Sequence, residues 1–166
     1  MLGNVVKALE DEGFRIRGID ELLHQLLAVP GPYGRLRPDA QAESDIRRAI
    51  VVVRALGAVD VGQAAVVQQG IVLGVEAAEG TDALLTRAGT LRRDGPGGVL
   101  VKLKKPGQER RADLPTIGRS TVAGAAAAGL AGIAVEAGAA LVVDAPAVTK
   151  AADEAGLFVT GITLSD

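Results

Sequence analysis

Apolar residues recur at helical spacing in several separate parts of the chain. In "PDAQAESDIRRAIVVVRALG" they return every three or four positions, Pro38 and Asp39 provide a start signal, and Gly57 provides a stop. This pattern predicts one long helix that bridges two parts of the molecule. Thr116, Ser120 and Thr121 compete as caps of an alanine-rich helix. The remaining helical patterns cover residues 4–13, 21–28, 79–89 and 146–156.

Runs rich in Val, Ile and Leu alternate with these helices and predict strands. The run 64–76 divides at Gln69-Gly70, which is typical of a β-hairpin, and 133–144 is also interpreted as a hairpin. Single strands are expected at residues 14–18, 97–105 and 157–162.

The hairpin patterns also resemble each other. The segment ending at Glu76 aligns without gaps with the segment ending at Asp144, which indicates either an internal duplication or the common layout of a hairpin before a helix. The chain is therefore expected to be an α/β protein, with α+β as the alternative. Its mixed β-sheet of hairpins and single strands would be covered by helices.

Composition narrows the chemistry that such a fold could carry. Hydrophobic residues make up 48% of the 166 residues and aromatic residues only 2%, so Val, Leu, Ile and Ala must fill the core. There is no cysteine, and His24, the single histidine, lies at an apolar helical position and is interpreted as structural. Disulfides, thiolate metal sites and Ser-His-Asp triads are thereby excluded or disfavoured. The net charge of −2 and the scattered aromatics argue against nucleic-acid binding.

The stretch "KLKKPGQERRADLPTIG" concentrates positive charge in an otherwise slightly acidic chain. The turn expected at Pro106-Gly107 would bring cations on its two sides face to face, and the helix expected after Thr116 would point its free N–H groups at the same place. Lysine and arginine side chains in this arrangement are suited to phosphate. Asp113 either caps the helix or holds a divalent metal against the phosphate, and composition does not choose between these alternatives.

A second charged cluster, "VEAAEGTDALL", contains Glu76, Glu79, Thr81 and Asp82. One interpretation is a capped helix with acids in its first turn, for which Thr81 or Asp82 provides the start. The alternative is a set of oxygen ligands for a metal, supplied by a strand end and a helix start.

Five segments together resemble one known family. They are "DVGQA", "VEAAEGTDALL", "GGVLVKLKKPGQERRADLPTIG", "AAAAGLAGIAVEAG" and "AADEAGLFVTG". In order and spacing they are similar to the C-terminal domain of the bacterial UDP-2,3-diacylglucosamine pyrophosphatase that is unrelated to the calcineurin-like phosphoesterases. This resemblance runs from about Gly57 to Gly161. The chain departs from the family pattern at Glu109, usually aspartate, at Ala112, and at Arg119-Ser120.

The resemblance implies an activity and a set of site residues. The activity is Mg²⁺-dependent hydrolysis of UDP-2,3-diacylglucosamine to UMP and 2,3-diacylglucosamine 1-phosphate (lipid X), a step of lipid A biosynthesis. It implies Asp113 as the key catalytic acid, with Asp113, Asp82 and Glu79 as the metal shell. The implied substrate-binding residues are Lys102, Lys105, Gln108, Arg110, Arg111, Thr116 and Gln63.

The same resemblance implies a division of the chain. Residues 1–36 would be the end of an N-terminal α/β domain, 37–57 the connecting helix and 58–166 the C-terminal catalytic domain, so this stretch alone is expected to be inactive. The expected location is the cytoplasm, with peripheral contact at the inner membrane through a lipid-linked substrate. A homodimer is a further expectation, since the small-residue helix at 123–130 suits close packing on a partner. The alternative function is a non-catalytic module that binds an anion or a lipid phosphate.

Overall fold

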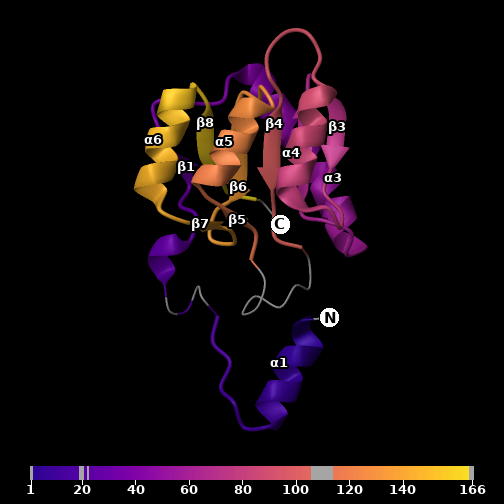
Figure 1. Ribbon diagram of the computed structural model, residues 1–166, viewed down its shortest axis with the longest axis vertical. Coiled ribbons are helices and arrows are strands. Elements are labelled where there is room, and N and C mark those ends of the chain that lie inside the picture. The colour runs from indigo at the N-terminus through magenta and orange to yellow at the C-terminus, as the bar shows by residue number, and fades with distance from the viewer. Residues whose placement is uncertain (1, 19–20, 22, 106–113, 165–166) are drawn as a thin grey trace.

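The computed structural model describes residues 2–18, 21, 23–105 and 114–164, and a mixed six-stranded sheet forms its centre. The strands lie in the order β1-β8-β6-β4-β2-β3 (Figure 1). They are β1 (Gly31–Pro32), β2 (Ala64–Gln68), β3 (Ile71–Val75), β4 (Val99–Lys102), β6 (Gly132–Glu136) and β8 (Phe158–Ile162). A separate parallel pair consists of β5 (Thr116–Ile117) and β7 (Leu141–Val142). The expected α/β class and mixed sheet are confirmed.

Helices cover both faces of the six-stranded sheet. Three of them, α4 (Gly80–Thr90), α5 (Arg119–Ala127) and α6 (Ala145–Ala155), lie side by side on one face, and α3 (Ala40–Ala58) crosses the other face behind β2 and β4 (Figure 1). The helix α1 (Leu2–Asp11) lies apart from the sheet in this view.

Burial on both faces explains the apolar composition of the central strands. Along β4, Leu100 packs into the cluster beneath α4, α5 and α6, while Val99 and Val101 pack into the cluster beneath α3. A strand covered on both sides needs apolar residues at every position, so its sequence does not alternate. The first polar side chain of β4, Lys102, comes at the strand's last position, on the side of α4, α5 and α6.

The strands β3, β4, β6 and β8 all run in one direction, so their carboxyl ends meet at one edge of the sheet. The helices α4, α5 and α6 each precede one of the parallel strands β4, β6 and β8, and therefore begin at that same edge. The carboxyl ends of parallel strands and the starts of helices are where α/β proteins most often bind ligands. We call this the carboxyl edge.

The predicted hairpin at Gln69-Gly70 is confirmed, and α3 supports it. Both turn residues have positive φ, 53° and 78°, as a tight two-residue turn between twisted strands requires. Asp45 on α3 is 1% exposed and accepts the backbone N–H groups of Gln69 and Gly70 at 2.9 and 2.7 Å. The long helix is therefore tied to the turn as well as to the face of the sheet.

Near the start of the chain, one predicted strand does not form, and one predicted helix is only partly helical. The residues 14–18 form no strand, because the sheet has its edges at β1 and β3 and this segment pairs with neither. Within the described part of 21–28, Glu21 is helical, whereas residues 23–28 contain the 3₁₀ turn η1 (His24–Leu26) and an isolated bridge from Leu27 to Leu141 rather than an α-helix. Pro30 disfavours helical backbone before it, and Ala28 instead exchanges backbone hydrogen bonds with Ala140 and Gly138.

The predicted hairpin at 133–144 is also wrong. Both edges of β6 are already occupied by β4 and β8, so the following segment cannot fold back on it and β7 pairs with β5 instead. At the start of α5, Gly118 occupies the cap position rather than Thr116, Ser120 or Thr121, although the Thr121 hydroxyl accepts the Gly118 N–H at 3.3 Å. The predicted domain boundaries stay a prediction.

Candidate functional site

A chain of hydrogen bonds connects charged side chains at the carboxyl edge. The Lys102 ammonium donates to the Thr81 hydroxyl at 2.7 Å and to the Thr116 carbonyl at 3.3 Å. The Thr81 hydroxyl donates to Glu76 Oε1 at 2.6 Å, and Glu76 Oε2 accepts the Gln63 backbone N–H at 3.3 Å. Residues from the ends of β3 and β4, from the first turn of α4 and from β5 are thus held in one network.

The two charged members of this network are buried. Lys102 is 5% exposed and Glu76 is 6% exposed. Buried charges are costly unless they are hydrogen-bonded, and both of these side chains have hydrogen-bond partners in the network. Gln63 belongs to the same corner, because its carbonyl accepts the Leu103 N–H at 3.0 Å. Its side-chain Oε1 is buried and has no hydrogen-bond partner within the described part of the chain.

Lys105 follows β4 and is fixed at the start of the cationic stretch. Its ammonium lies 2.7 Å from Asp60 Oδ1, and Asp60 is exposed on the turn after α3. The hydrogen bond from Lys105, followed by the positive charge of the same group, lowers the pKa of Asp60. Between the two lysines, the Lys104 backbone N–H donates to Glu136 Oε2 at 2.9 Å, which ties the end of β6 to the same stretch.

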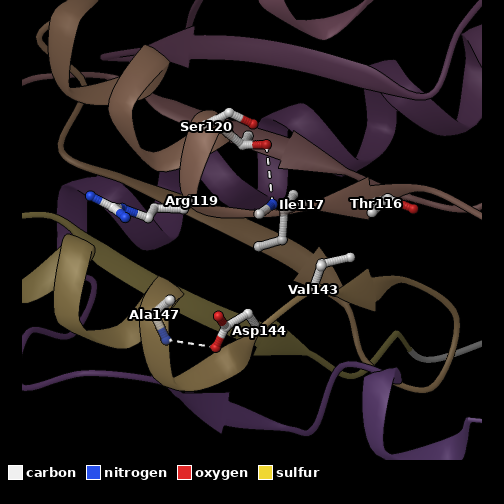
Figure 2. A pocket seen from close by; sticks show the side chains of 9 residues that line it. Thr116, Ile117, Arg119, Ser120, Val143, Asp144 and Ala147 are labelled. Atoms are coloured by element: carbon white, nitrogen blue, oxygen red, sulfur yellow. Dashed lines mark hydrogen bonds between the residues drawn. The ribbon is translucent and has the colours of Figure 1, made fainter.

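An open pocket of about 510 Å³ lies beside this network, between the starts of α5 and α6. Figure 2 shows Arg119 and Ser120 on the α5 side, with Asp144 and Ala147 on the α6 side. Asp144 accepts the Ala147 N–H at 3.2 Å. Thr116 lines the pocket, and its carbonyl also accepts the Lys102 ammonium, so the pocket and the charged network share a residue. The pocket is further lined by Ile117, Gly118, Thr121 and Val143.

The predicted metal residues in the described part of the chain do not form a metal site by themselves. Glu79 Oε1 pairs with Arg87 at 2.6 Å, and its Oε2 accepts the Ala77 N–H at 3.1 Å. A hydrogen bond from the backbone N–H of Glu79 itself, then the bond from Arg87, lowers the pKa of Glu79. Asp82 is exposed in the first turn of α4. Over residues 2–18, 21, 23–105 and 114–164, no three acidic or histidine side chains gather as metal ligands would.

The structure therefore brings together part of the predicted site. Lys102, Thr116 and Gln63 meet around one corner of the carboxyl edge, and Lys105 is anchored nearby on Asp60. Asp113, Gln108, Arg110 and Arg111 lie outside the described residues, so the turn at Pro106-Gly107 and the roles given to these four stay predictions.

Sequence reasoning gave too little weight to Glu76 and Thr81, the two residues that link this corner together. Both were in the acidic cluster, but the metal role was given to Glu79 and Asp82. The position of Glu76, directly after the apolar strand β3, was the available signal, because an acid that closes a buried strand needs an internal partner. No signal in the sequence indicated the pocket beside Arg119 and Asp144.

No helix in the described residues combines the length and the hydropathy needed to cross a bilayer.

Comparison with known proteins identifies relatives of the chain. Residues 29–160 match the family model of the LpxI C-terminal domain. The chain is also 48% identical, over 168 aligned residues, to the UDP-2,3-diacylglucosamine pyrophosphatase LpxI of Caulobacter vibrioides. This alignment covers 98% of the chain and 60% of the relative, so the chain spans only part of that protein's length.

Proposed function

The chain belongs to the LpxI C-terminal domain family, and from this membership we propose that it is the part of a UDP-2,3-diacylglucosamine pyrophosphatase that binds the diphosphate. The reaction would cleave the pyrophosphate bond and release UMP and 2,3-diacylglucosamine 1-phosphate, a step of lipid A biosynthesis. The relative's name supplies the substrate and the reaction type.

The observation that supports this proposal most directly is the position of Lys102. This residue is 5% exposed, yet it lies at the carboxyl edge, where the starts of α4, α5 and α6 also converge. Helix starts carry partial positive charge and free N–H groups, so they add to the field of the lysine. A diphosphate in this region would meet positive charge from both the side chain and the backbone.

The proposed roles follow from this electrostatic arrangement. Lys102 and Lys105, with Gln108, Arg110 and Arg111, would hold the phosphoryl oxygens and stabilise the negative charge that develops on the departing UMP. Thr116 and Gln63 would line the same corner. We propose Asp113 as the catalytic acid and as a Mg²⁺ ligand, with Asp82 and Glu79 as further candidates. Bound Mg²⁺ would neutralise part of the charge on the diphosphate.

We also propose where the protein acts. Its lipid-linked substrate implies a cytoplasmic protein with peripheral contact at the inner membrane. A homodimer is an additional proposal, motivated by the small residues of α5, and light scattering that gives a monomer mass would reject it.

The test is a UMP-release assay with and without Mg²⁺. Because the chain matches 60% of the relative's length, the assay uses the chain as it stands and the chain extended by the remaining part of the relative. We expect Mg²⁺-dependent release from the extended form and little or none from the chain as it stands. The variant Asp113→Asn in the extended form should still bind substrate but release no UMP, and unchanged release by this variant would reject the proposed role of Asp113.

A binding module without catalysis is the second candidate, favoured by the buried lysine and the pocket beside it. It predicts metal-independent binding of 2,3-diacylglucosamine 1-phosphate, and no release of UMP by the extended form. The same assay therefore separates the two functions.

A further inference from the structure

The Thr81 hydroxyl lies between a buried carboxylate and a buried ammonium. It is 2.6 Å from Glu76 Oε1 and 2.7 Å from Lys102 Nζ. A hydroxyl has one proton and two acceptor lone pairs, an ammonium can only donate, and a carboxylate can only accept. The direction of both bonds is therefore fixed: Thr81 gives its proton to Glu76 and accepts one from Lys102.

Both ends of this hydrogen-bonded chain, Glu76–Thr81–Lys102, are fixed by further hydrogen bonds. Glu76 accepts the Gln63 backbone N–H through its other oxygen, and its own N–H donates to the Ala64 carbonyl at 2.9 Å. On the other side, the Thr116 carbonyl accepts the Lys102 ammonium at 3.3 Å. Thr81 is placed by the first turn of α4, whose helix packs on the sheet through Leu84 and Leu85. The hydroxyl is thus as rigidly held as the strand ends.

Such a hydrogen-bonded chain restricts the position of a lysine ammonium. The side chain has a flexible four-carbon stem and a point charge, so without fixed acceptors the ammonium samples several positions. Productive charge stabilisation requires the group to be held within about 0.5 Å of its working position. An acceptor that is itself oriented by a buried carboxylate provides that restraint.

We propose that Thr81 is a positioning residue, which holds the Lys102 ammonium at the point where the diphosphate binds. This inference rests on the proposed function for its substrate. It assigns Thr81 a role distinct from the metal-binding role predicted for its neighbours Glu79 and Asp82, and distinct from a helix cap.

The test compares three variants in the extended, UMP-releasing form. Thr81→Val removes the hydroxyl at nearly constant volume, Thr81→Ser retains it, and Thr90→Val makes the same change at the exposed end of α4, where Thr90 donates only to a backbone carbonyl. We expect Thr81→Val to lower kcat by about 10–100-fold with a smaller change in KM, because the charge that Lys102 stabilises grows in the transition state. Thr81→Ser should restore kcat to within about 3-fold, and Thr90→Val should behave as wild type.

A double-mutant cycle shows whether Thr81 acts through Lys102. If it does, Thr81→Val added to Lys102→Met should cause no further loss of kcat, whereas a general structural effect would add its full cost. A wild-type kcat for Thr81→Val, no recovery in Thr81→Ser, or additive losses would each overturn the inference. So would a deficit that disappears at high Mg²⁺ concentration, since Thr81 would then act on the metal. If Thr81→Val does not fold, Thr81→Ala takes its place in the same comparison with Thr81→Ser.

A second measurement is independent of catalysis. Acetic anhydride modifies free amines, and peptide mass spectrometry gives the rate at Lys102 in each variant. We expect this rate to rise several-fold in Thr81→Val but not in Thr81→Ser or Thr90→Val, because only the valine variant removes the shorter of the two hydrogen bonds described for the amine. Unchanged labelling overturns the inference. Lack of UMP release by the wild type, with labelling as expected, would reject the proposed function and leave the restraint on Lys102 established.

Discussion

The segments 66–76 and 134–144 each end in an acid that precedes a helix on the same face of the sheet, but the two acids are used in opposite ways. Glu76 is 6% exposed and turns inward to the Gln63 N–H and the Thr81 hydroxyl. Asp144 is exposed, has φ 55° and caps α6 through the Ala147 N–H. An acid at the same place in a similar pattern therefore builds an internal charge network in one case and a helix cap in the other.

The surroundings of each segment cause the difference. The strand β3 is an outer strand of the sheet, so its segment can close as a hairpin and place its last residue beside the start of β2. The strand β6 lies between two strands, so its chain leaves the sheet and reaches α6 from the small β5-β7 pair. The position of the acid therefore depends on whether its strand is an outer strand, as β3 is, or lies between two others, as β6 does.

The largest effect is expected from the inward-facing acid. Glu76→Leu removes the acceptor of both the Thr81 hydroxyl and the Gln63 N–H. We expect a loss of about 3 kcal/mol in the free energy of unfolding, because each part-buried donor left without an acceptor costs roughly 1–3 kcal/mol. Urea denaturation measures this loss of unfolding free energy. Glu76→Gln keeps an acceptor oxygen and should lose about 1 kcal/mol. Equal losses for both variants would mean that charge, not hydrogen bonding, accounts for the role of Glu76.

The two turns give the next contrast. The turn at Gln69-Gly70 depends on a side chain, Asp45, whereas the N–H of Gly138 in the other segment donates to the Ala28 carbonyl. Asp45→Ala should lower the free energy of unfolding by about 2 kcal/mol, with water partly replacing the carboxylate at the exposed turn. Asp45→Asn, which keeps one acceptor oxygen, should lie between this variant and wild type in urea denaturation. A loss of unfolding free energy below about 0.5 kcal/mol for Asp45→Ala would show that the turn is stable without the hydrogen bonds to Asp45.

These contrasts show what the sequence could predict. Period and turn chemistry identified α3, α4, α6, β4, β8 and the hairpin at Gln69-Gly70, because those features are local. The errors concern which strands pair with each other. Residues 14–18 form no strand, and β7 pairs with β5 rather than with β6. In the site, Lys102 was selected from its charge, but the burial of Glu76 and the bridging by Thr81 depend on how α4 packs on the sheet. A pattern of residues does not contain that packing.

The outward-facing acid should matter less. Asp144→Ala loses the hydrogen bond to Ala147 and places a Cβ-bearing residue without a polar side chain at positive φ, so we expect a loss of about 1–2 kcal/mol in unfolding free energy. Asp144→Gly loses the same bond but accepts that backbone conformation freely, and should lie within about 0.5 kcal/mol of wild type. Thermal and urea unfolding of the pair measure the difference. Equal losses for Ala and Gly would assign the cost to the cap alone.

The smallest effect is expected at Asp60, an exposed acid near the start of the first segment. Its pKa is lowered by the hydrogen bond and charge of Lys105, so it stabilises the folded state above its unfolded pKa of about 4. That contribution is lost as the pH falls through the lower pKa of the folded protein. The melting temperature of Asp60→Asn should therefore lie slightly below that of wild type between pH 5 and about pH 8, and the difference should vanish in acid and shrink in high salt. A difference that persists in acid and in salt would show that Asp60 acts through the shape of its turn, at φ 55°, rather than through its charge.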